Sequence, residues 1–393
     1  VNHIMVLGSN IRSYLRSSKI PYNASMQSFF LWSGIFLGAS VTAFALIKVI
    51  FSLFIHSGIV DKPHLYPHEK GRGPLPYPGG VVLILNMVLW SPWIISSVAD
   101  ADIKKTIYVL LAGLITTLIM AWDDQRRTLP PLFRLVFQVS LGAFFGLTAI
   151  KIGYVSNIFW GIISLDTFQS LQWTISGETI YLVPLLATII WYVLVMNAIN
   201  WSDNGRAMTS SVGLVTCIIL AGLSIKLYLT DTTLASQNNS RFVLSFLTIF
   251  IPTLFVFCRF DVRRACIVGD AGSMFLGFMI ATLAIVAGGK IATASIVLGI
   301  YFIDAFYVII GRIRAGKNPM KGDLTHLHHR MAEQGIDYTL QRHLVMVLSF
   351  IFGLGAIFLD TWGKIILFAS IITVVIYIAQ IAQTLEKFIT KKK

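Results

Sequence analysis

The feature that most constrains this chain is a series of long apolar stretches that recurs from residue 27 to residue 385. A membrane-spanning helix needs about 20 predominantly apolar residues, and eleven stretches approach that length. The sequence therefore predicts an all-α integral membrane protein, a polytopic bundle of about 11 transmembrane helices. The predicted spans are residues 27–55, 79–99, 105–122, 132–150, 179–198, 207–228, 241–258, 266–288, 290–311, 342–360 and 363–385.

Composition excludes most other classes of protein. Hydrophobic residues make up 56% of the chain and charged residues only 12%, which is about half the charged fraction of a soluble domain. A soluble multidomain enzyme, a disordered chain and a collagen-like fibre are excluded. Cys217, Cys258 and Cys266 lie in or beside apolar stretches without CxxC spacing, so we expect small buried side chains rather than a disulfide framework or a zinc site.

The net charge of +13 is concentrated on one predicted side of the membrane. With eleven spans, the loops on the side of the C-terminus carry 18 Lys and Arg residues and the opposite side carries 8. Because cytoplasmic loops concentrate these residues, we expect the C-terminus in the cytoplasm and the N-terminus outside. The basic excess therefore needs no nucleic-acid partner.

The chain divides into one large part and two short ends. Residues 27–385 form a single polytopic transmembrane domain, because the longest polar loop has about 30 residues and leaves no room for a soluble domain. Residues 1–26 are a tail or an interfacial amphipathic helix. Residues 386–393 are a basic cytoplasmic tail.

Two adjacent carboxylates, Asp123 and Asp124, end the third predicted span. They repel each other unless a cation neutralises them, and such oxygen ligands suit Mg²⁺ bound together with substrate phosphates. The alternative is a solvated helix end with Arg126 and Arg127 as counter-charges.

A polar patch, Asn197-Ala-Ile-Asn200-Trp-Ser-Asp203-Asn204-Gly205, follows the fifth span. Asn197, Asn200 and Asp203 recur at three-residue spacing and share one helix face. The patch suits sugar or nucleotide hydroxyls, and the alternative is a helix C-cap at Gly205.

Asp270 opens the eighth span within Val268-Gly269-Asp270-Ala271-Gly272-Ser273. A Gly-flanked acid before a helix is typical of an N-cap. The same geometry receives a phosphate or positions a metal-binding carboxylate, because the helix N-terminus offers free N–H groups and a positive dipole end.

Three imidazoles, those of His326, His328 and His329, lie beside Arg330 in a basic loop after the ninth span. Clustered imidazoles bind transition metals, but the surrounding cations favour phosphate. The alternative is a solvated basic loop.

A Pro- and Gly-rich segment, Pro74-Leu-Pro76-Tyr-Pro78-Gly79-Gly80, enters the second span just after Lys70 and Arg72. Pro stiffens such a loop and Gly allows a close approach of backbones. A simple turn is the alternative.

In this order and on one predicted face, these motifs resemble the polyprenyl-phosphate N-acetylhexosamine-1-phosphate transferase family. Its members include the bacterial enzymes that start enterobacterial common antigen and teichoic acid linkage units, and phospho-MurNAc-pentapeptide translocase is a more distant relative. The resemblance runs from about Asp61 to Arg330. Its most specific parts are Gly-Asp-x-Gly-Ser and the His-x-His-His loop.

The resemblance implies transfer of N-acetylhexosamine-1-phosphate from a UDP-sugar to a polyprenyl phosphate, with release of UMP, at the start of cell-envelope glycan synthesis. The protein would be a multi-pass protein of the inner (plasma) membrane with its active site on the cytoplasmic face. Its partners would be the lipid acceptor, the nucleotide-sugar donor and membrane lipids, and a homodimer is left open.

The resemblance also implies roles for residues. Mg²⁺, or Mn²⁺, would be held by Asp270 with Asp123 or Asp124, and one of that pair may act on the lipid phosphate. The phosphate clamp would be His326, His328 and His329 with Arg330. Donor-binding residues would be Lys70, Arg72, Asn197, Asn200, Asp203 and Arg206.

Three departures from the family pattern fall where relatives hold the nucleobase and donor. Arg206 stands in place of a second acid, Ile267-Val268 replaces Phe-Met, and residues 260–264 lack the usual Asn-x-x-Pro-Ala element. A different nucleotide-sugar donor, including a peptidoglycan precursor, and a catalytically degenerate membrane scaffold are therefore the alternatives. Direct attack and a covalent aspartyl intermediate both stay open.

Overall fold

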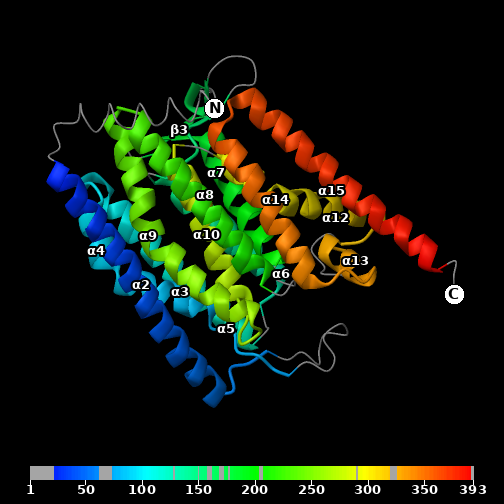
Figure 1. The fold of residues 1–393 in the computed structure, drawn as a ribbon. Helices are drawn as coiled ribbons and strands as arrows, with labels where there is room; N and C mark the ends of the chain where they lie inside the picture. The colour runs from blue at the N-terminus through cyan, green and yellow to red at the C-terminus, as the bar shows by residue number, and fades with distance from the viewer. Residues whose placement is uncertain are drawn as a thin grey trace.

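The computed structural model describes most of the chain between residues 22 and 390. The described residues are 22–61, 73–126, 129–148, 150–156, 162–167, 172–175, 178–202, 207–288, 291–318 and 325–390, the side chains of 22–29 and 378–390 excepted. The fold is a helical bundle in which α10 runs through the middle and α2 and α15 lie on the outside (Figure 1).

Each predicted apolar stretch folds as a helix or as a pair of helices. The single helices are α2 (Tyr22–His56), α5 (Ile103–Arg126), α6 (Pro131–Leu147), α7 (Leu182–Trp201), α8 (Met208–Thr230), α9 (Leu234–Val262), α10 (Gly269–Val286), α14 (Tyr338–Phe358) and α15 (Thr361–Thr390). The pairs are α3 (Gly79–Leu89) with α4 (Ser91–Ser97), and α11 (Ile291–Val297) with α12 (Gly299–Arg314). A short helix, α13 (Leu327–Glu333), precedes α14.

The described helices support a multi-pass membrane protein, but fewer of them than the eleven predicted meet the length and composition of a span. By length and composition, 7 helices can cross a membrane, or up to 9 if each bent pair is one span. The pairs bend by 56° between α3 and α4 and by 76° between α11 and α12. Pro92, in the first turn of α4, lacks the N–H that a continuous helix needs. Two further apolar helices, Pro131–Leu147 and the described part Thr361–Tyr377, are shorter.

The region between α6 and α7 contains two small β-hairpins that the sequence did not predict. Strand β1 (Tyr154–Ser156) pairs with β2 (Ile162–Ser164), and β3 (Gln172–Ile175) pairs with β4 (Glu178–Tyr181), both antiparallel. Short 3₁₀ turns lie at Asp100–Asp102 and Leu165–Thr167. The Tyr154 hydroxyl donates a hydrogen bond to the Gly288 carbonyl and so connects β1 to the far end of α10.

Helix α10 is the most buried of the candidate spans and packs against α3, α5, α7 and α8. Small residues allow this close packing. A Cβ on Gly80 of α3 would lie 2.6 Å from the Ala271 carbonyl carbon. One on Gly277 of α10 would lie 2.8 Å from the Met196 Cα of α7. The expected close approach of backbones at Gly79 and Gly80 is therefore confirmed, and it sets the position of the first turn of α10.

We expect Gly80→Ala to lower the thermal midpoint of the protein by about 5 °C or more, because the new Cβ would meet backbone atoms that have no room to move. Gly34→Ala on α2 is the matched control, since its Cβ would meet nothing within 4 Å. The fraction that stays monodisperse after heating in detergent measures the midpoint. Equal midpoints for the two variants would contradict the close packing.

Candidate active site

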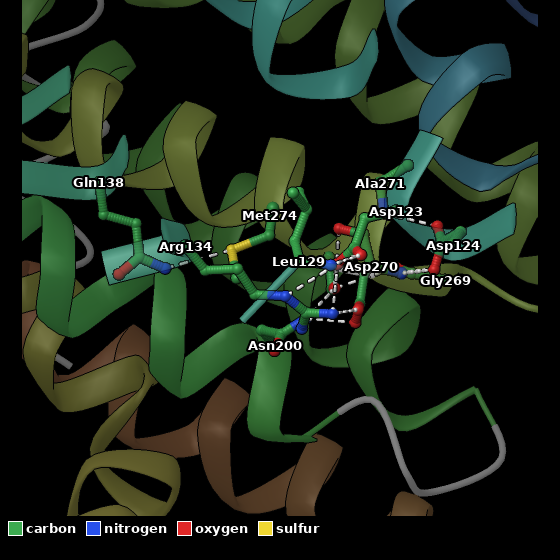
Figure 2. A network of polar contacts seen from close by, with 11 residues as sticks. Asp123, Asp124, Leu129, Arg134, Gln138, Asn200, Gly269, Asp270, Ala271 and Met274 are labelled. Carbon is green, nitrogen blue, oxygen red and sulfur yellow. Dashed lines mark hydrogen bonds and ion pairs between the residues drawn. The ribbon is translucent and has the colours of Figure 1, made fainter. Parts of the chain in front are cut away.

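Four helix ends bring polar side chains together at one end of the bundle. The last turns of α5 and α7 lie beside the first turns of α6 and α10, and Figure 2 shows their side chains converging. The predicted residues Asp123, Asp124, Asn200 and Asp270 all belong to this network. The structure therefore brings together residues that lie up to 147 positions apart in the sequence.

Asp124 holds the first turn of α10. Its Oδ1 accepts a hydrogen bond from the Asp270 N–H and its Oδ2 from the Ala271 N–H, both at 2.9 Å. A carboxylate at a helix N-terminus satisfies donors that have no partner within the helix and meets the positive end of the dipole. Gly269 adopts φ +69° at this turn, a conformation that favours glycine. The N-terminal cap of α10 thus comes from α5, and the carboxylate of Asp270 is left available for other contacts.

Asp123 and Asp270 share one cation, Arg134 of α6. The Arg134 guanidinium donates to Asp123 Oδ2 from Nε at 2.9 Å and from Nη2 at 2.5 Å. The same Nη2 lies 2.7 Å from Asp270 Oδ2. Asp123 is fully buried, and its second oxygen accepts from the Leu129 N–H at 2.9 Å. The fork of the guanidinium suits two carboxylates at once, so Arg134 neutralises the acids on both sides of it (Figure 2).

The two predicted asparagines of α7 have different partners. Asn200 Nδ2 donates to Asp270 Oδ1 at 2.8 Å and to Ser273 Oγ at 2.9 Å. Asn197 Nδ2 instead donates to Gln138 Oε1 of α6 at 2.6 Å. Asn200 therefore orients the Asp270 carboxylate, whereas Asn197 joins α7 to α6 one turn further into the bundle.

The three carboxylates offer unequal access to a metal ion. Within the described part of the chain, no group of three or more His, Cys, Asp or Glu side chains could hold a metal ion. All three carboxylates have hydrogen-bond or ion-pair partners, those of Asp270 being Asn200 and Arg134, but Asp123 is fully buried while the side chain of Asp270 is 27% exposed. Mg²⁺ is usually bound through one or two carboxylates plus waters and substrate phosphates. The donor set therefore fits Mg²⁺ held by Asp270 and a substrate diphosphate.

The histidine loop is anchored to α12 by a buried acid. His326 Nδ1 lies 2.8 Å from Asp304 Oδ2, and the Leu327 N–H donates to Asp304 Oδ1 at 2.8 Å. His326, His328 and His329 are all buried, with the rings of the last two centred 4.1 Å apart. The ring of His326 is centred 6.2 Å from that of Trp201, the residue after Asn200. The histidine loop therefore contacts Trp201, the neighbour of the network residue Asn200.

A hollow opens beside these histidines. It encloses about 460 Å³, including space open to solvent. Its walls come from α7, α8, α12, α13 and α14, and they include Trp201, Asp304, His326 and His328. The Arg330 guanidinium lies 4.6 Å from the centre of the Tyr307 ring on α12.

Four predicted site residues lie outside the described residues, namely Lys70, Arg72, Asp203 and Arg206. The predicted nature of the cysteines is confirmed, because Cys217, Cys258 and Cys266 are buried free thiols. Burial, with a smaller contribution from Asp261, raises the pKa of the Cys266 thiol. Because the thiolate is the reactive form, Cys266 is an unreactive packing residue close to the site.

Arg134 and Asp304 are site residues that no sequence motif indicated. Both lie inside predicted apolar spans, at 132–150 and 290–311. A charged residue inside a span is costly and by default indicates a functional partner. That signal could have identified both residues, but not their partners, because each partner comes from a different helix or loop.

The chain is similar to known membrane transferases. Residues 106–288 match a family model described as glycosyl transferase family 4. A probable undecaprenyl-phosphate N-acetylglucosaminyl 1-phosphate transferase of Bacillus subtilis is 24% identical over 366 residues, which cover 91% of this chain and 92% of the relative. A decaprenyl-phosphate N-acetylglucosaminephosphotransferase of Mycobacterium leprae is 26% identical over 74% of both chains. A phospho-N-acetylmuramoyl-pentapeptide-transferase of Lactobacillus gasseri is 26% identical over 82% of this chain and 98% of its own length.

We expect Arg134→Gln to destabilise the protein by about 2 kcal/mol, because Asp123 is left buried without its cation. Asp123→Asn in the same chain should recover more than half of that loss, since it removes the charge that Arg134 neutralised. Arg241→Gln, at an exposed position on α9, is the control and should change little. The thermal midpoint in detergent is the measurement, and a double variant less stable than Arg134→Gln would contradict the pairing.

Proposed function

We propose that this chain, which is similar to glycosyl transferase family 4 and to polyprenyl-phosphate N-acetylglucosamine-1-phosphate transferases, transfers N-acetylhexosamine-1-phosphate from a UDP-sugar to a polyprenyl phosphate. The observation that carries the proposal is the network of Asp124, Asp270 and Arg134 beside the anchored histidine loop. The products are the lipid-linked sugar diphosphate and UMP, and the reaction starts a cell-envelope glycan.

The reaction needs positioning and charge neutralisation more than covalent help from the protein. An oxygen of the lipid phosphate forms a bond to the β-phosphorus of the donor. The bond from that phosphorus to the bridging oxygen breaks, and the electron pair leaves with UMP. Negative charge grows on the bridging oxygen during this step, so cationic and N–H donors beside it stabilise the transition state.

Arg134 and the histidine loop are the groups that meet this charge. Arg134 already bridges two carboxylates, with 28% of its side chain exposed, so its guanidinium can extend toward a phosphate without leaving the network. The ring of His326 lies beside Trp201, the residue after Asn200, and the ring of His328 stacks next to it. Arg330 and the residues Lys70 and Arg72 are proposed to bind donor phosphates.

Mg²⁺, or Mn²⁺, supplies a further positive charge that neutralises the diphosphate when it is bound. Asp270 is the carboxylate that would hold it, since Asn200 orients one of its oxygens and the side chain is partly exposed. Asp124 supports that carboxylate indirectly by fixing the first turn of α10. Asp123 serves mainly to place Arg134, because it is fully buried whereas Asp270 is partly exposed.

If the chain has eleven spans, the distribution of Lys and Arg between the two sides of the membrane supports a site on the cytoplasmic side. Ends of α5, α6, α7 and α10 and the histidine loop all lie at one end of the molecule, which is the end with the larger Lys and Arg count in the loops. We therefore place the C-terminus in the cytoplasm and the N-terminus outside, in the inner (plasma) membrane.

Membrane vesicles provide the direct test. A UDP-N-acetylglucosamine donor labelled at its β-phosphate should pass its label to lipid in inverted vesicles but not in sealed right-side-out ones. EDTA should block the transfer and added Mg²⁺ should restore it. Asp270→Asn should lower the rate by about 100-fold or more, with folded protein retained.

The control for Asp270→Asn is Asp360→Asn. Asp360 also accepts a hydrogen bond at a helix N-terminus, from the Gly363 N–H at 2.8 Å, but it is exposed at the start of α15. It should leave the rate within about twofold. Folded protein that transfers nothing from any of a panel of nucleotide sugars would overturn the proposal, and donor binding without turnover would identify a scaffold.

Arg206 provides a test of donor choice. Because Arg206 stands where the family pattern has an acid, Arg206→Asp should change the ratio of kcat/KM between donors more than the maximal rate. The panel includes UDP-N-acetylglucosamine and the peptidoglycan precursor. Arg314→Asp, an exposed charge reversal on α12, should leave the ratio unchanged. An equal effect of Arg206→Asp on all donors would show that this position does not select the donor.

A further inference from the structure

Asp304 is a buried carboxylate on α12 that makes two contacts with the histidine loop. Its Oδ2 lies 2.8 Å from His326 Nδ1 and its Oδ1 accepts from the Leu327 N–H at 2.8 Å. The side chain is 12% exposed and that of His326 is 9% exposed. No motif in the sequence connected the two residues, which are 22 positions apart.

We propose that Asp304 is the positioning residue for His326 in the transfer reaction, which rests on the proposed function. Asp304 sets which ring nitrogen carries the proton and in which direction the ring points. His326 then presents Nε2 to the substrate phosphates. Asp304 itself touches no reacting atom.

The chemistry of the two groups determines the assignment of the ring nitrogens. A carboxylate can only accept a hydrogen bond, so Nδ1 must be the donor in this contact. The remaining nitrogen, Nε2, is then the atom left for a ligand, as an acceptor in the neutral ring and as a donor in the imidazolium. A ring nitrogen held by a second group is the usual way in which proteins fix an imidazole for function.

The His326 ring lies at the wall of the hollow, where a substrate could contact Nε2. Asp304 and His326 both line the hollow, together with Trp201 and His328. Trp201 follows Asn200, which contacts Asp270. A substrate that extends from Asp270 past Trp201 would therefore reach the His326 ring, which Asp304 holds in place.

The second contact of Asp304 ties the loop backbone to α12. The Leu327 N–H belongs to the first residue of α13, and its hydrogen bond to Asp304 Oδ1 fixes where α13 begins. Asp337 supplies a comparison, since it accepts from the Thr339 N–H at 2.7 Å at the start of α14. Asp304 thus differs from an ordinary cap by its additional contact with an imidazole.

This difference suggests Asp304→Asn as the test variant. The Asn oxygen can still accept from the Leu327 N–H, so the cap is retained. The Asn amide nitrogen can only donate to Nδ1, however, so it favours the ring protonated at Nε2, which is the wrong tautomer. We expect kcat to fall about 100-fold with KM changed less than about threefold. Asp337→Asn, the matched cap variant, should leave kcat within about twofold.

A double variant separates positioning from a merely structural role. If Asp304 acts through His326, then Asp304→Asn in a His326→Ala background should lower kcat by no more than about threefold beyond His326→Ala alone. Losses that multiply, or an Asp304→Asn enzyme with normal kcat, would overturn the proposal. Restoration of much of the rate by Asp304→Glu would support it.

A spectroscopic measurement does not depend on the activity of any variant. Heteronuclear NMR of the full chain with isotope-labelled histidine, with the His326 signal assigned by its loss in His326→Ala, should show Nδ1 protonated. A neutral ring protonated at Nε2 would overturn the proposal even if Asp304→Asn failed to fold. Failure of the wild-type protein to transfer any sugar phosphate would instead contradict the proposed function, and the NMR result would still decide the pairing.

Discussion

The hydrogen bonds from the first turn of α10 to Asp124 are the interaction on which the rest of the site depends. A buried helix N-terminus leaves backbone N–H groups without partners, and each costs about 1–3 kcal/mol if it stays unsatisfied. Many helices are capped by the residue that directly precedes them, but the N-cap residue Val268 makes no side-chain cap here and the first turn of α10 is capped by Asp124 of α5. These hydrogen bonds join α5 to α10 and leave the Asp270 carboxylate to contact Asn200 and Arg134.

Burial of charge explains why the site is built from pairs. An ionised group taken out of water needs a partner, and the removal of one partner leaves the other uncompensated. Asp123 and Asp270 share Arg134, while Asp304 faces His326. Because Arg134 and His326 are also the groups that can meet a phosphate, stability and phosphate recognition rest on the same contacts. A substrate diphosphate therefore enters a network that is already charge-balanced, and it must compete with carboxylates for the guanidinium.

The sequence predicts the membrane spans and the acidic motifs because both are encoded locally. Apolar runs of sufficient length and acids at their ends can be identified without knowledge of the fold. The partners of these acids and histidines cannot be identified in this way, since Arg134 and Asp304 contact them only once α6 lies beside α5 and α12 lies beside the histidine loop. The bends at Pro92 and before Gly299 and the two hairpins were also missed, because a hydropathy pattern gives the length of an apolar run but not its direction.

Asp123 and Asp124 show how a pair of identical neighbours in sequence becomes two different groups in space. Successive residues of a helix point about 100° apart, so at the last turn of α5 one carboxylate faces α6 and the other faces α10. Asp123 is consequently committed to Arg134, and Asp124 to the α10 backbone. An adjacent pair of acids at a helix end therefore does not imply a shared metal. In this protein the pair instead supports Asp270, because Asp124 holds the first turn of α10 and Asp123 holds the arginine that contacts the partly exposed Asp270 carboxylate.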